Sequence, residues 1–322
     1  MNTLRDLAVD NTIDSEGLTT VIENLTKYSG LLQSMPVAPS SHGVFHRFAL
    51  AADLATGKFR ALNGSIVPSS ISKDVETEDL FEMSALDELD SSYVENLPSD
   101  IMGVFQDRAP QFSIGMGQNL AKQFFDGIHG SGDAGGFAGL RDLAIANGLN
   151  QSMGGEEGSS STMYIVRWQE GVMEGLFNSN MVDAGEIVKT ELIGKGATYT
   201  KVTDTSTGAT TFKKAAKYTA YLGLLKAGTS NVAVITNIED ASGDGPTAAA
   251  IDKAIEQVKG YTNSGDVAIY CNSRVYRLTN TLKNSKLETV AKDKLYSARL
   301  ATWDGIIPIW IDDNITNTED YS

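Results

Sequence analysis

Cysteine is nearly absent from this chain of 322 residues, in which Cys271 is the single example. One thiol cannot form an internal disulfide, and such usage is typical of a reducing compartment like the cytoplasm. Long apolar runs are missing as well. The longest candidate, GIIPIWI near the end, is far shorter than the roughly 18–20 residues of a membrane span. The acidic, polar N-terminus is not typical of a secretory signal, so we expect a chain that functions outside the membrane.

Basic residues are also scarce, with 26 Lys and Arg against 41 Asp and Glu and a net charge of −15. This balance argues against an extended groove for nucleic acid, because phosphate binding requires clustered cations. The stretch from Asp74 to Asp100 holds ten acids and no Lys or Arg. It is either a solvated face or a surface that meets basic partners and repels polyanions.

The sequence contains the residue pattern of a nucleotide-binding motif, but the predicted elements around it are not those that the motif requires. Gly130, Gly132 and Gly135 form G-x-G-x-x-G within FFDGIHGSGDAGGFAGLRDL. A dinucleotide loop follows a strand and opens a helix, whose N-terminus then faces the pyrophosphate. Here the glycines follow a predicted helix, Asp133 adds a carboxylate, and Gly-Lys-Ser/Thr is absent from the sequence. The pattern favours a flexible corner that ends a helix.

Metal and catalytic patterns are equally weak. His42 and His46 have a helical spacing of four, but they lie in a loop that leads into a strand, and His129 is distant in sequence. Cys271 follows a buried type of strand, where a small apolar residue is usual. IDDN at 311–314 indicates a turn that ends a strand. We therefore predict no catalytic residue, no metal and no cofactor.

The first part of the chain divides into two segments. Residues 1–43 are interpreted as a weakly structured arm with one helical candidate, SEGLTTVIENLTKYSGLL, ended by SMPVAPSSHG. Residues 44–75 are interpreted as a long hairpin, in which VFHRFAL and KFRALNGSIV flank a turn at 54–57. This hairpin has too few apolar residues to bury itself, so it requires another surface.

The remainder alternates between helices and strands without repeats. A long helix is predicted after Ser99, with apolar residues every fourth position to Ile128 and a kink or restart at Pro110. Residues 147–161 are Gly/Ser-rich and indicate a flexible connection. A hairpin is expected over 185–225. Strands are predicted at TMYIVRW, NVAVITNI, DVAIYCN and GIIPIWI, with one helix after Pro246 and another after DVAIYCN. The class is α+β without strict βαβ alternation.

Several blocks, in this order, resemble the major capsid proteins of tailed bacteriophages, which have the Hong Kong 97-type fold, and above all the coat proteins of short-tailed phages. The blocks are FRALNGSIVPSSISKDVETEDLFEMSALDELD, FFDGIHGSGDAGGFAGLRDL, TMYIVRW, NVAVITNIED and VAIYCNSRVYRLTNTL. Each block is weakly specific alone, but their order and spacing extend the resemblance from about Leu18 onward.

The resemblance implies a division of the chain into the parts of that fold. They would be an N-terminal arm (1–43), an E-loop (44–75), a peripheral domain with a long spine helix (76–150), an axial domain (151–300), and a strand returning to the peripheral domain with the C-terminal tail (301–322). In this family the arm and E-loop lie across neighbouring subunits. The predicted interface residues are Phe45, Arg47, Phe48, Lys58, Phe59 and Arg60.

The implied function is a major capsid protein that self-assembles as hexamers and pentamers into an icosahedral shell. The shell would enclose double-stranded phage DNA without sequence-specific binding, after assembly in the host cytoplasm. Because only about forty residues precede the E-loop, a separate scaffolding protein is expected, with a portal and a decoration protein as further partners. Lys58 and Lys73 are available for the subunit cross-link of some relatives, but no acid catalyst is marked.

Two alternatives stay open at this point. An encapsulin-like bacterial compartment shares the fold but encloses an enzyme instead of DNA. A nucleotide-dependent enzyme would rest on the Gly130 loop alone.

Overall fold

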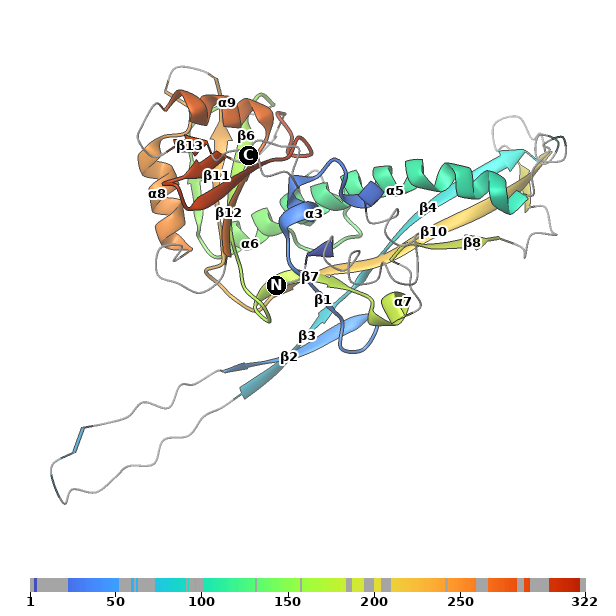
Figure 1. Ribbon diagram of the computed structural model, residues 1–322, viewed down its shortest axis with the longest axis horizontal. Coiled ribbons are helices and arrows are strands. Elements are labelled where there is room, and N and C mark those ends of the chain that lie inside the picture. Colours follow the sequence, from blue (N-terminus) through green and yellow to red (C-terminus); the bar gives the residue numbers. More distant parts are fainter. Residues whose placement is uncertain are drawn as a thin grey trace.

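The computed structural model describes most of the chain, and its strands form three sheets (Figure 1). The described residues are 3–4, 23–51, 59–60, 62, 73–90, 92, 96, 101–130, 132–156, 158–183, 187–193, 200–203, 210–240, 243–258, 266–282, 287–289 and 301–318. Within them, every helix is too short or too polar to cross a membrane.

One body of the molecule is a seven-stranded sheet with the order β13-β14-β15-β12-β6-β11-β5. Its strands are β5 (Asn150–Ser152), β6 (Ser161–Trp168), β11 (Val232–Ile238), β12 (Asp266–Cys271), β13 (Leu287–Thr289), β14 (Ala301–Trp303) and β15 (Ile307–Ile311). The helices α8 (Ala248–Gln257) and α9 (Ser273–Thr281) cover one face. On β6, Met163 packs toward these helices, whereas Tyr164 belongs to the core on the other face. Burial on both faces accounts for the continuous apolar runs in these strands.

The second body is a six-stranded sheet in which β10 is the central strand. Its strands are β1 (Val37–Pro39), β4 (Phe81–Asp90), β7 (Met173–Phe177), β8 (Lys189–Leu192), β9 (Thr200–Thr203) and β10 (Thr210–Lys226). β10 pairs with β4 from Lys213↔Asp90 to Leu222↔Phe81. The long helix α5 (Ile101–Asp126) lies along this sheet (Figure 1). It runs through Pro110 as one helix, so the predicted restart at that residue is wrong.

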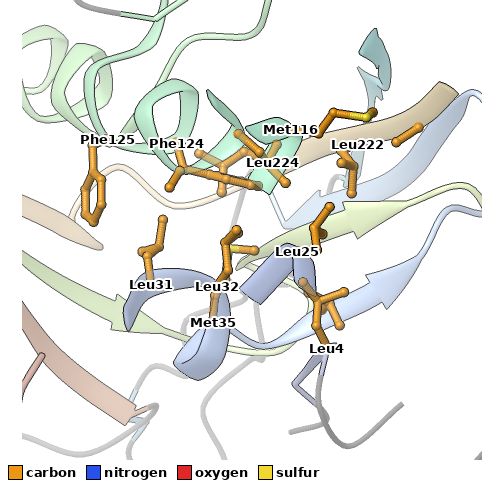
Figure 2. Close-up of a cluster of buried hydrophobic side chains, with 14 of the residues drawn as sticks. Leu4, Leu25, Leu31, Leu32, Met35, Met116, Phe124, Phe125, Leu222 and Leu224 are labelled. Atoms are coloured by element: carbon orange, nitrogen blue, oxygen red, sulfur yellow. The ribbon is translucent and has the colours of Figure 1, made fainter. Parts of the chain in front are cut away.

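The N-terminal segment is built into the core between the two bodies (Figure 2). Its buried side chains meet Phe124 and Phe125 of α5 and Leu222 and Leu224 of β10. They are Leu4, Leu25, Leu31, Leu32 and Met35. The interpretation of residues 1–43 as a weakly structured arm is therefore wrong for the described part, residues 3–4 and 23–43. Residues 5–22 lie outside the described residues.

Hydrogen bonds hold this segment in place in addition to its apolar packing. Ser29 caps α3 (Gly30–Ser34) and donates from Oγ to the buried carboxylate of Asp312, at 2.6 Å. The same carboxylate accepts from the Leu31 amide at 3.1 Å. β1 then pairs in parallel with β7. The helical candidate SEGLTTVIENLTKYSGLL does not form one helix, because Ser29 starts a new helix within it, and its residues 15–22 lie outside the described residues.

Two of the expected domain boundaries do not follow the sheets. The stretch 151–300 is not one axial body, because β7 to β10 leave the seven-stranded sheet and pair with β4 in the other one. The final strand over 301–322 does not return to that second sheet either. β15 instead pairs in parallel with β12 through Ile269↔Ile309, and the backbone groups along the edge of β12 form the hydrogen bonds of this pairing.

The Gly/Ser-rich stretch 147–161 is not a flexible connection. β5 adds to the edge of β11 in parallel, and the Met153 and Gly155 amides continue that pairing by donating to the carbonyls of Thr236 and Asn237, both at 2.9 Å. A Cβ on Gly155 would lie 2.6 Å from the Asn237 carbonyl oxygen. The glycine thus permits close backbone approach.

The strands with strong apolar patterns are confirmed. TMYIVRW is β6, NVAVITNI is β11, DVAIYCN is β12 and GIIPIWI contains β15. The two helices expected after Pro246 and after DVAIYCN are α8 and α9, whose N-caps are Thr247 and Asn272. The expected hairpin over 185–225 is β9 and β10.

Candidate functional site

A two-stranded ribbon projects from the body and is the most distinctive surface feature (Figure 1). β2 (Phe45–Ala51) pairs antiparallel with β3 (Lys73–Asp79), from Phe45↔Asp79 to Ala51↔Lys73. We call β2, β3 and their connection the hairpin. The predicted pairing of VFHRFAL with KFRALNGSIV is wrong. β3 continues through Leu80 directly into β4. The long pairing of β4 with β10 therefore fixes which residues of the chain can pair with β2.

The two faces of the ribbon differ in what they contact. Alternation places Phe45, Arg47 and Val75 on one face and Phe48 and its cross-strand neighbour Glu76 on the other. Arg47 is exposed, and Val75 is 64% exposed despite being apolar. Phe48 instead packs on its own subunit, against the small buried cluster of Leu80, Leu176 and Leu225. The predicted interface residues on β2 are therefore not equivalent: Phe48 belongs to the hairpin base.

The connection between β2 and β3 carries unpartnered apolar side chains. Phe59 is fully exposed and Leu62 is 98% exposed, with Arg60 exposed beside them. Lys58, the remaining predicted interface residue, lies outside the described residues. Burying a Phe or Leu side chain contributes about 1.5–3 kcal/mol, so these two side chains have a large gain available from a partner surface. Leu62 is not among the predicted interface residues, because it lies in KFRALNGSIV, which has the pattern of a paired strand.

A groove between β4 and α5 has the complementary character. Its volume is about 440 Å³ and its floor is mainly apolar. The lining residues are Met83, Ser84, Ala85, Arg108, Gln111, Phe112, Gly115, Met116 and Asn119. A second hollow of about 150 Å³ shares Met83 and Asn119 with it. Among the described strands β4 pairs with β10 alone, so its other edge is open beside the groove.

An ion pair holds the two walls of the groove together. The Asp87 carboxylate on β4 is buried and lies 2.9 Å from Nε of Arg108 on α5. Burial raises the pKa of Asp87, and the neighbouring Arg108 partly offsets that rise. Removing one partner of such a pair costs more than removing both, because the remaining charge stays buried. The groove is therefore a fixed feature of the subunit.

The glycine-rich corner after α5 is closed by its own hydrogen bonds. The Ile128 and Gly139 amides donate to Oδ2 of Asp142, at 3.1 and 3.2 Å. Gln123 ties the far side by donating to the Phe137 carbonyl at 2.6 Å. Gly127 has φ +67°, and a Cβ there would lie 2.1 Å from the Asp142 carboxylate. The Ile128 and Gly139 amides are thus bonded within the subunit, and the described part of the corner is a braced bend instead of the predicted flexible one.

The other chemical candidates are structural as well. Within the described part of the chain, no three His, Cys, Asp or Glu side chains gather as a metal site would require. His42 stacks on Phe45 with ring centroids 4.8 Å apart. Cys271 is fully buried, and burial raises the pKa of its thiol, which leaves no thiolate for nucleophilic attack. The IDDN turn positions Asp312 to hold the N-terminal segment.

Comparison with known proteins agrees with this geometry. A family model described as major capsid protein GP7 matches residues 14–321. A chain from a structure of bacteriophage Epsilon15 is 15% identical over 89% of this chain and 87% of that chain, with a TM-score of 0.54. No curated protein matches.

Two further solved structures are similar at lower scores. A chain of the bacteriophage JBD30 capsid is 8% identical, covers 80% of this chain and 83% of that chain, and has a TM-score of 0.48. A chain of the holo-SrpI encapsulin complex from Synechococcus elongatus PCC 7942 is 9% identical, with coverage of 66% and 88% and a TM-score of 0.45. Of the three structures, only the Epsilon15 chain exceeds 0.5, and at its identity it shows a shared fold alone.

The expected α+β capsid fold is thereby confirmed. The family match extends over almost the whole length of the sequence. It supports the interpretation as a capsid protein over the encapsulin and nucleotide-enzyme alternatives. This chain belongs to the major capsid protein GP7 family and has the Hong Kong 97-type phage capsid fold.

Proposed function

We propose that many copies of this chain assemble as hexamers and pentamers into an icosahedral shell around double-stranded phage DNA. The observation that carries the proposal is the hairpin, which projects from the body (Figure 1) and whose apolar side chains Phe59 and Leu62 are exposed. A two-stranded ribbon is marginal by itself and is usually completed by another surface. In a closed shell each such contact can be weak, because every subunit is tied to several neighbours at high effective concentration.

The hairpin tip of one copy occupies the groove between β4 and α5 of a neighbour. Phe59 and Leu62 match its apolar floor of Met83 and Met116. The open edge of β4 adds backbone donors and acceptors for an extended segment. Ser84, Gln111 and Asn119 of the lining offer polar atoms to Arg60, which gives the contact a polar component. The predicted interface residues Lys58, Phe59 and Arg60 act here, with Phe45 and Arg47 along the exposed face of the ribbon.

Filling the groove tests this docking directly. Gly115 lines the groove, and a Cβ there meets nothing within 4 Å, so the side chain of Gly115→Leu has room to start from the helix and extends into the groove. Gly103→Leu is the matched control, since Gly103 is also helical and open but lies outside the groove lining. Both changes remove a helix glycine and should leave the subunit folded. We expect Gly115→Leu to reduce shell yield at least tenfold and Gly103→Leu to leave it intact, measured by sedimentation and negative-stain microscopy.

The partner side is tested by Phe59→Ser, with Phe212→Ser as its control at another exposed aromatic. Phe59→Ser should assemble poorly while keeping wild-type subunit stability. If both Gly115→Leu and Phe59→Ser assemble at the wild-type rate, the docking proposal is wrong. If wild-type chains form no closed particles under any assembly condition, the shell proposal itself is wrong. Nucleic acid inside purified particles supports a virion, whereas a protein cargo supports a compartment.

Partners and location follow as the finer part of the proposal. Assembly takes place in the host cytoplasm with a separate scaffolding protein, a portal and a decoration protein. The acidic balance of the chain supports a shell that encloses DNA without adhering to it. Saturable binding of the isolated subunit to random duplex DNA at 150 mM salt would contradict that last point.

A further inference from the structure

The groove between β4 and α5 continues into the second hollow, and we call the two hollows together the channel. They share Met83 and Asn119. The α5 lining runs from Arg108 to Asn119 in the first hollow and from Asn119 to Gln123 in the second. At 1.5 Å per helical residue, Arg108 and Gln123 lie about 22 Å apart along α5. An extended segment of about seven residues therefore spans the length of the channel.

The two ends of the channel carry opposite charges. At one end Arg108 pairs with the buried Asp87, but the Arg108 side chain is 42% exposed and is the member of the pair that lines the channel. Asp133 of the glycine-rich corner lines the other end and is exposed. Its amide donates to Oε1 of Gln123 at 2.6 Å, which ties Asp133 to that end of α5. The channel therefore has an electrostatic direction.

Two acids line the corner end, and they differ in what already binds them. The Glu82 carboxylate accepts hydrogen bonds from Lys217 and from the Tyr221 hydroxyl. The Asp133 carboxylate accepts from the Gly135 amide at 3.0 Å, and within the part of the chain that the structure describes it forms no ion pair with a Lys or Arg. Asp133 is thus the acid that a cation of a partner can meet.

The connection of the hairpin carries the complementary charge. Between residues 54 and 72 the sequence contains Lys58 and Arg60 and no acid. Arg60 is exposed and lies in sequence between the exposed apolar side chains of Phe59 and Leu62. A segment that is both apolar and cationic matches a channel with an apolar floor and an acidic end.

We propose that Asp133 sets the direction in which a neighbour's hairpin connection lies in the channel, with Arg60 at the Asp133 end and remote from Arg108. This direction rests on the proposed function, since the connection must first occupy the groove. The reverse direction would bring two guanidinium groups together and leave Asp133 without a cation. Because Arg60 has five N–H donors, it can bond to Asn119, which lines both hollows, and to Asp133 together.

The charge contributes to direction more than to affinity. Phe59 and Leu62 supply most of the binding, and apolar side chains fit either hollow. An exposed ion pair changes the equilibrium of one contact by only about twofold to fivefold. The same contact recurs at every subunit of a closed shell, so a small preference in each contact is sufficient to select one arrangement.

Cross-linking of assembled full-length chains determines the direction. Ala61→Cys places a thiol beside Arg60, and a second thiol is placed near one end of the channel by Ala134→Cys or near the other by Gln111→Cys, both at exposed positions. Cys271 is buried and leaves no competing thiol. With a short bismaleimide we expect about fivefold more covalent dimer from the Ala134 pair than from the Gln111 pair, because Gln111 and the corner end lie about 18 Å apart along α5.

Substitutions of Asp133 separate its charge from its backbone hydrogen bond. Asp133→Asn keeps an acceptor for the Gly135 amide and removes the charge. We expect this variant to lower the ratio of the two cross-links about threefold, and Asp133→Lys to reverse it. Adding Arg60→Glu to Asp133→Lys should restore the original ratio, because opposite charges then meet again at the corner end.

The direction is overturned by equal cross-linking at the two ends, by an unchanged ratio in Asp133→Lys, or by a yield no higher than that of Ala61→Cys alone. Docking itself is judged separately by Gly115→Leu and Phe59→Ser, whose loss of assembly requires no particular direction. If those two variants assemble normally, docking and direction are both wrong. If they fail to assemble and the cross-links are equal, only the direction is wrong.

Discussion

Two neighbouring segments of the chain, residues 23–40 and the hairpin, are held in opposite ways. The first is threaded between the two sheets and buries Leu25, Leu31 and Leu32 against α5 and β10 (Figure 2). The second projects from the body (Figure 1) and packs on it through Phe48, whereas Phe59 and Leu62 in its connection are exposed. The first segment completes the hydrophobic core of the subunit, whereas the second leaves apolar side chains exposed to solvent. The energetic consequences of substitutions should therefore differ sharply between them.

The largest effect is expected in the buried segment. Leu31→Ala removes a fully buried side chain and leaves a cavity, which should lower the free energy of unfolding by about 2–5 kcal/mol. Equilibrium denaturation of unassembled subunits measures it. A loss below 1 kcal/mol would show that this segment is not part of the cooperative core.

A smaller effect should come from the hydrogen bonds that close the same segment. Asp312→Ala leaves the Ser29 hydroxyl and the Leu31 amide without their acceptor, at a cost of about 1–3 kcal/mol. Asp312→Asn probes the pH dependence. Burial raises the pKa of Asp312, so its contribution to stability grows as the pH falls through that raised value towards the ordinary 3.8. The Asn variant should lack this acid-side gain in denaturation curves recorded from pH 7 to 4.

The hairpin base should respond less than the buried segment. Phe48→Ala removes a half-buried ring from the cluster of Leu80, Leu176 and Leu225, so we expect a loss of roughly 1–2 kcal/mol, below that of a fully buried residue. Protease cleavage within the hairpin should accelerate more than global unfolding does. If protease cleavage and global unfolding accelerate equally, the hairpin belongs to the main cooperative unit, and the difference between the two segments is wrong.

The smallest effect on the isolated subunit is expected on the outer face of the ribbon. Val75 is 64% exposed, and Val75→Ala should change the free energy of unfolding by less than about 0.5 kcal/mol. Shell assembly is the more informative readout for the same variant. A stability loss as large as that of Leu31→Ala would mean that the ribbon folds back onto its own body in solution.

Prediction from sequence succeeded where one local pattern decides the outcome. β6, β11 and β12 are buried on both faces, so each stands out as a short apolar run. The helices expected after two of them are also present, and Thr247 and Asn272 cap them. The exposed hairpin was also foreseen, because the segment has too few apolar residues to bury itself. Of the six predicted interface residues, Phe59 and Arg60 lie at the exposed tip.

Prediction failed where the partner is distant in sequence. The prolines and serines around residues 34–43 suggested a loose arm, but Asp312, nearly 300 residues away, closes that segment. β2 was paired with the next extended stretch, while the actual partner is set by β4 and β10. The groove between β4 and α5 has no sequence signature, since its lining comes from two elements that meet only after folding.

The sequence by itself determined the secondary structure of the apolar stretches and membership of a capsid family. These depend on local periodicity and on the order of motifs. Tertiary structure alone decided which sheet each strand joins, that the described N-terminal segment is core, and that Phe48 packs the base of the hairpin on its own subunit. Strand pairing and burial are long-range: a ladder is complete only with both strands present, and apolar residues contribute stability according to what covers them.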